Sequence, residues 1–184
     1  MSTSTATLVP AGTWSVDPAH STIGFQVKHM GIATVRGQFT EAEGTLEVGE
    51  DLSTAAAHAT IKAASVDTGE QSRDDHLRSA DFFDAESYPD LTFASTAIEQ
   101  LDDEAFRVTG DLTLHGVTRE VALHAEVQGT DTDPWGNDRV GLEITGQLDR
   151  SDFGMEFNQA LGSGNKLVSD KVKLALDISA VKQG

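Results

Sequence analysis

The chain of 184 residues contains no cysteine. This absence excludes disulfide bonds, zinc–thiolate sites and catalysis by a thiol nucleophile. Basic residues are also few, because 13 lysines and arginines stand against 30 aspartates and glutamates, for a net charge of −17. A nucleic-acid partner needs a basic surface and is therefore excluded. An anionic membrane surface is disfavoured for the same reason.

Long apolar runs are absent as well. No stretch approaches the ~18 residues that a membrane-spanning helix needs, so we expect no stable membrane insertion. The first residues, MSTSTATLVPAGTW, have neither the basic nor the apolar region of a secretory signal peptide. We therefore expect a cytoplasmic protein with a flexible tail over residues 1–11 and a single domain over residues 12–184.

Alternation of apolar and polar residues dominates the rest of the chain. Segments with one dry face and one wet face are typical of antiparallel strands. Eight such strands, with few helices to cover a flat sheet, most simply close into a barrel, and a sandwich is the alternative. The predicted class is therefore all-β. The expected strands span residues 22–30, 33–48, 55–66, 90–99, 105–115, 117–128, 139–149 and 170–181.

Many residues on the dry faces are small. One row consists of Ala55, Ala57, Ala59, Ile61 and Ala63. The interior of an eight-stranded barrel is just filled by side chains, or holds one ligand where the side chains are small. The row is compatible with a cavity, and equally with small residues that only relieve crowding where the barrel tapers.

The stretch SADFFDAESYPDLTF, residues 79–93, does not alternate. Ser72, with Asp75 three residues later, is typical of a helix N-cap. Pro89 favours an extended residue before it and a return to strand. We therefore expect a short helical crossover near residues 72–84, continuing at most to residue 88.

Two adjacent aromatic residues lie in this crossover. Leu77, Ala80 and Phe83 are spaced three apart, which places them on one side of a helix. On that basis Phe83 docks the helix on the barrel rim, and Phe82 turns toward the opening as part of a lid. The alternative is that both rings are ordinary core residues.

Catalytic and metal-binding patterns are weak throughout. His115 and His124 lie on two arms of an expected hairpin, roughly 15 Å apart at ~3.3 Å per residue, which is too far to share a metal. His29 follows the apolar face of its strand and is expected to line a pocket. Residues 131–138, DTDPWGND, imitate a calcium loop but are better explained as a hairpin turn. We expect no catalytic site, no metal and no cofactor.

Five segments carry a family resemblance: WSVDPAHSTIGFQVKHMGIATVRGQF (14–39), FFDAESYPDLTF (82–93), GDLTLHGVTREVAL (110–123), DPWGNDRVGLE (133–143) and DRSDFGM (149–155). In this order they resemble the YceI-like family, over residues 12 to 182. The resemblance implies a lipocalin-like barrel that holds a long isoprenoid lipid, either a polyisoprenoid or an isoprenoid quinone. It also implies homodimers and, for many members, export to the periplasm, although this chain shows no export signal. It supplies no catalytic motif.

Three hypotheses follow. The first is an isoprenoid-binding barrel for carriage or storage. The second is an enzyme that acts on an apolar substrate in the same cavity, with His29 as the candidate reactive group. The third is a packed scaffold without a ligand. For the first hypothesis, the predicted ligand-binding residues are Phe25, Val27, His29, Ala57, Ala59, Ile61, Leu77, Phe82, Phe83, Phe93 and Leu174.

Overall fold

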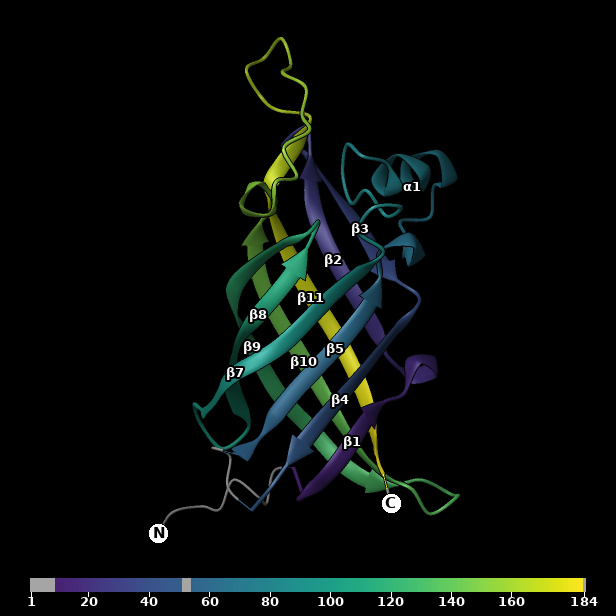
Figure 1. The fold of residues 1–184 in the computed structure, drawn as a ribbon, viewed down its shortest axis with the longest axis vertical. Helices are drawn as coiled ribbons and strands as arrows, with labels where there is room; N and C mark the ends of the chain where they lie inside the picture. The colour runs from purple at the N-terminus through teal and green to yellow at the C-terminus, as the bar shows by residue number, and fades with distance from the viewer. Residues whose placement is uncertain (1–8, 51–53, 184) are drawn as a thin grey trace.

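A computed structural model describes residues 9–50 and 54–183 (Figure 1). In these residues the regular secondary structure is mostly strand, with one short α-helix. In order, the elements are β1 (Gly12–Val16), η2 (Pro18–His20), β2 (Thr22–His29), β3 (Ala33–Phe39), β4 (Ala42–Val48), β5 (Ala56–Lys62), η4 (Ala63–Ser65), β6 (Val66–Asp67), α1 (Gln71–Arg78), β7 (Asp90–Gln100), β8 (Ala105–Leu114), β9 (Val117–Thr132), β10 (Asp138–Asp149), η5 (Arg150–Phe153) and β11 (Val168–Lys182).

Eight strands form a closed antiparallel ring. They follow the order β1, β4, β5, β7, β8, β9, β10 and β11, and β11 then pairs with β1. Strands β2, β3 and β6 extend the sheet from the other part of β11. The expected eight-stranded antiparallel barrel is confirmed and the sandwich alternative is excluded. None of the described helices is long and apolar enough to cross a membrane.

Strands β1 and β2 run along the same edge of β11. Val16 of β1 pairs with Ala180, and Ile23 of β2 pairs with Leu176. Between them, the carboxylate of Asp17 accepts a hydrogen bond from the backbone N–H of Ala19 at 3.0 Å, which caps η2. The two strands therefore act as two halves of one bent strand. The alternation pattern does not predict β1.

Two apolar clusters occupy the barrel. One lies at the end covered by α1 and η5, and it contains Ala63, Val66, Phe82, Phe83, Leu91, Leu114, Phe153 and Met155. The other lies at the end where β1 meets the last residues of β11, and it contains Val9, Trp14, Val140 and Ala180. Because Val9 is buried, the packed domain begins before residue 12. Most of the expected tail, residues 1–8, lies outside the described residues.

The helical crossover is confirmed, but its expected extent is wrong. Helix α1 ends at Arg78, where the N–H and Oγ of Ser79 both bond to the carbonyl of His76. At the other end, Glu70 rather than Ser72 is the N-cap, because the Glu70 carboxylate accepts the backbone N–H of Ser72 at 3.1 Å. Residues 80–88 form successive turns instead of helix.

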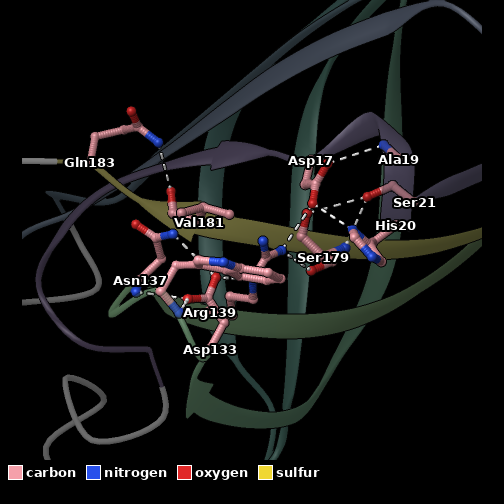
Figure 2. A network of polar contacts seen from close by, with 11 residues as sticks. Asp17, Ala19, His20, Ser21, Asp133, Asn137, Arg139, Ser179, Val181 and Gln183 are labelled. Atoms are coloured by element: carbon pink, nitrogen blue, oxygen red, sulfur yellow. Dashed lines mark hydrogen bonds and ion pairs between the residues drawn. The ribbon is translucent and has the colours of Figure 1, made fainter.

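A polar network fastens the β9–β10 hairpin to the β1–β2 bend (Figure 2). Arg139 donates to Asp17 at 2.9 Å and to Asp133 at 2.8 Å. Asp133 also accepts the backbone N–H groups of Asn137 and Trp135, at 3.0 and 2.9 Å. The N–H of Asn137, followed by Arg139, lowers the pKa of Asp133 to about 2. The expected hairpin turn at residues 131–138 is therefore present and is built on the Asp133 carboxylate.

This network predicts acid sensitivity. With a folded-state pKa of about 2 for Asp133, its contribution to stability is complete above pH ~4 and is lost as the pH falls toward 2. We expect Asp133→Asn to lower the midpoint of thermal unfolding by several degrees at neutral pH. This difference from wild type should shrink between pH ~4 and ~2. Circular dichroism at a series of pH values measures both curves.

The control is Asp103→Asn, which removes the same charge from an exposed residue of the β7–β8 hairpin. Its unfolding curve should stay close to the wild-type curve at every pH. A constant difference between Asp133→Asn and wild type down to pH ~2 would contradict the role assigned to the Asp133 carboxylate.

Candidate functional site

The barrel encloses an apolar cavity of about 320 Å³. Ligand pockets commonly have volumes of about 300–1,000 Å³. The cavity wall includes Phe83 and Met155 from one apolar cluster, and Trp14 and Ala180 from the other. The space therefore extends along the barrel from the α1 end to the β1 end, and nearly all of the lining is hydrocarbon.

Ten of the predicted ligand-binding residues line this cavity. They come from strands β2, β5, β7 and β11, from α1 and from the turns that follow it. These residues are Phe25, Val27, Ala57, Ala59, Ile61, Leu77, Phe82, Phe83, Phe93 and Leu174. The structure brings them together around one space, and their contact with a ligand stays a prediction.

His29 does not line the cavity. It is exposed, and it is the last residue of β2. The pairing of β2 with β11 shifts register between Val168 and Val172, which breaks the alternation just before His29. Met30 and Gly31 then turn the chain with positive φ angles of 56° and 74°. The expectation that His29 faces the cavity is wrong, because His29 is exposed at the end of β2, although it is still paired with Val168 and Ala33.

Some small inward residues do relieve crowding. A Cβ atom at Gly37 would lie 2.5 Å from Cζ of Phe25, and one at Gly110 would lie 2.5 Å from Cζ of Phe93. Real Cβ atoms do not approach other heavy atoms this closely, so each glycine allows one ring to lie against the backbone of a neighbouring strand. At these two positions the crowding explanation holds.

Other small residues leave space open. Ala57 and Ala59 of β5 both line the cavity, and each carries only a methyl group. Gly44 of β4, which pairs with Ala59, also lines it, but a Cβ atom there would lie 3.0 Å from Cγ2 of Val16, so Gly44 belongs with the crowded positions. At Ala57 and Ala59 the cavity explanation holds, and it coexists with the crowding explanation elsewhere.

Phe82 and Phe83 both face inward, because the chain is no longer helical at these positions. They are 6% and 9% exposed, and both line the cavity. Phe83 contacts the ring of Phe39 on β3, with centroids 5.5 Å apart. Phe82 contacts the rings of His76 and Phe157 at 5.0 and 5.3 Å. The expectation that a continuous helix points the Phe82 and Phe83 rings in different directions is wrong. The expected docking of Phe83 on the barrel is present.

Arg150 is the cavity residue that the sequence analysis misses. It is 5% exposed and lines the cavity at the α1 end. Its guanidinium donates to the carbonyls of Met155, Ser169 and Val168, at 2.7, 3.0 and 3.3 Å. Burial lowers the pKa of Arg150, and the carboxylate of Asp170 opposes this effect. The alternation of β10 could have predicted that Arg150 faces inward, since it lies two residues after Leu148, which also faces inward.

The open interior predicts tolerance of a large side chain. In delipidated protein, we expect Ala59→Trp to change the free energy of unfolding by less than about 1 kcal/mol, whereas overpacking of a filled interior costs ~1–3 kcal/mol. Urea unfolding measures this difference. The control, Thr92→Trp, places the same ring at an exposed position of neighbouring β7. A loss above ~3 kcal/mol confined to Ala59→Trp would mean that this part of the interior is filled.

Comparison with known proteins agrees with the barrel fold. A family model described as a YceI-like domain matches residues 14–180. Protein YceI of Escherichia coli O157:H7 is 38% identical over 165 residues, covering 89% of this chain and 83% of that protein. The Campylobacter jejuni YCEI protein, at 33% identity, has a TM-score of 0.73 and covers 91% of this chain and 96% of its own.

A more distant structure shares the fold. A polyisoprenoid binding domain from Saccharophagus degradans, at 17% identity, has a TM-score of 0.70 and covers 92% of this chain and 98% of its own. The family model and the Escherichia coli relative each extend over most of the chain. The chain therefore belongs to the YceI-like family.

Proposed function

We propose that the barrel binds a long-chain isoprenoid lipid, a polyisoprenoid or an isoprenoid quinone, and carries or stores it. The observation that supports this proposal is the apolar cavity of about 320 Å³ that extends between the two ends of the barrel. A long hydrocarbon chain matches both its direction and its lining. The description of the Saccharophagus degradans relative as a polyisoprenoid binding domain supports the same ligand class.

Energetics favour carriage over permanent sequestration. Moving one methylene from water into an apolar interior is worth ~0.8 kcal/mol, so a prenyl chain strongly avoids water. The same chain is already dry in a membrane, and its transfer from membrane to barrel is close to neutral. A barrel of this kind can therefore both accept and release its lipid.

The alternatives receive less support from the cavity. An enzyme needs a reactive group beside its substrate, but the expected candidate His29 lies outside the cavity. Two other titratable lining residues, Glu43 and His58, are exposed, and Arg150 is bonded to backbone carbonyls. A fully packed scaffold is difficult to reconcile with the open space beside Ala59.

The segment that carries Phe82 and Phe83 is the natural passage for the lipid. The barrel wall is a ring of hydrogen-bonded strands, and opening it there would break a ladder. Residues 71–88 cover the cavity without belonging to the ring. Segments held mainly by side-chain packing open at lower free energy than strands, so we infer that this cover acts as a lid.

Purification from the cells that naturally express the protein tests the proposed function. Native mass spectrometry should detect one lipid per chain, with an isoprenoid mass after release. Ala59→Trp, produced in the same cells, should carry much less of it, because the indole occupies the same space. Wild-type protein that carries only straight-chain acyl lipid, or that carries none and takes none up from vesicles containing either a prenyl phosphate or an isoprenoid quinone, would refute the proposal.

The lid predicts coupled effects on stability and exchange. Because both rings are buried, we expect Phe82→Ala and Phe83→Ala each to lower the free energy of unfolding by ~3–5 kcal/mol. Phe82→Ala should also speed the transfer of a fluorescent prenyl lipid to vesicles, since the Phe82 ring joins the cover to residues outside it, Phe157 and Arg150. Ile32→Ala, at a residue 79% exposed, is the control. Unchanged transfer rates in both phenylalanine variants would exclude the lid.

A further inference from the structure

One buried charge stands beside the cavity. Among the described residues, the buried charged side chains are Asp74 and Arg150. Asp74 accepts from the N–H and Oγ of Thr68 and does not line the cavity. Arg150 does line it, at the end covered by Phe82. The wall thus carries a single buried cation in an otherwise hydrocarbon surface, within the described part of the chain.

The guanidinium of Arg150 has donors to spare. It carries five N–H groups, and three hydrogen bonds connect it to the protein, one each from Nε, Nη1 and Nη2. Each terminal nitrogen bears two hydrogens and uses one of them. One N–H on Nη1 and one on Nη2 therefore have no partner among the described residues, and each can donate a hydrogen bond to an oxygen of an acidic group.

The positive charge also lacks a direct counterion. All three acceptors are neutral carbonyls, and Arg150 makes no ion pair with the described residues. The carboxylate that raises the pKa of Arg150 is that of Asp170. It accepts hydrogen bonds from the N–H and Oγ of Ser151, at 2.9 and 2.8 Å, and does not bond to Arg150. The ring of Phe82, 5.9 Å away, supplies a weak cation–π contact. A desolvated charge without a counterion is costly, and an acidic ligand group would reduce that cost.

We propose that Arg150 binds the head group of the lipid, and that this head group is acidic: a phosphate or a carboxylate at the end of the prenyl chain. The inference rests on the proposed function, since it takes the chain in the cavity as given. The chain then extends from Arg150 toward Trp14 at the other end of the cavity. A neutral head group would use the spare donors but leave the charge unpaired.

The net charge of −17 does not oppose this site. Surface charges are screened over about 8 Å at physiological salt, whereas the buried guanidinium acts locally and with little screening. The acidic surface instead disfavours small anions that lack an apolar chain. Only an anion attached to a long hydrocarbon forms favourable contacts both with the apolar wall and with Arg150 at the end of the cavity.

Three probes with the same geranylgeranyl chain test the head group: the phosphate, the carboxylic acid and the alcohol. Trp14 lines the cavity and reports binding by its fluorescence. Trp135, which is 81% exposed, is replaced by Phe in every protein so that Trp14 is the sole reporter. We expect the phosphate or the acid to bind at least about tenfold more tightly than the alcohol. The stronger of the two acidic probes identifies which head group the site takes.

Arg150→Met should abolish this preference, so that its affinities for the three probes lie within about threefold of one another. Arg150→Lys, which keeps a charge, should retain part of the preference and covers the case in which Arg150→Met does not fold. Arg107→Met, at an exposed cation on β8, removes the same charge and should retain the full preference. Equal affinities of wild type for all three probes, or an unchanged preference in Arg150→Met, would overturn the head-group site alone. Failure of wild type to bind any probe would overturn the proposed function as well.

Discussion

Strand β11 is hydrogen-bonded along both edges, to β10 on one side and to β2 and then β1 on the other. This double pairing closes the sheet, and a closed sheet has an interior that only its inward side chains can fill. The closure requires a bend between β1 and β2, which Asp17 caps and Arg139 fastens to the neighbouring hairpin. The cavity, its apolar lining and its two ends all depend on this closure.

Within the closed ring, the size of each inward side chain decides between packing and space. Gly37 and Gly110 are small because a ring from the adjacent strand occupies the volume that their side chains would take. Ala57 and Ala59 are also small, and both line the cavity. The same residue sizes therefore have opposite consequences, depending on the neighbouring strand.

Alternation was sufficient to predict the barrel and seven of the lining residues, since one face of each strand must be dry. The other three, Leu77, Phe82 and Phe83, came from the predicted helical crossover. Alternation fails where the strand geometry changes. His29 continues the inward row of β2, but it is the last residue of the strand and is exposed, next to an irregular pairing with β11 and a turn. Arg150 continues the inward row of β10 and does line the cavity. The end of α1 could not be predicted either, because Ser79 ends the helix through a hydrogen bond to the carbonyl of His76, and the spacing of apolar residues does not indicate such a bond.

An apolar wall recognises the length and width of a chain but does not distinguish one hydrocarbon from another of similar shape, because the hydrophobic effect is non-directional. Chemical selectivity has to come from groups that form directional bonds. Within the described lining, the buried group with spare donors is Arg150, and the chain keeps it there despite the cost of burying a charge. Its three carbonyl bonds hold the guanidinium in one orientation before any ligand arrives. In the proposed complex, this preorganised donor at the end of the cavity would select the head group, and the apolar wall would contact the hydrocarbon chain.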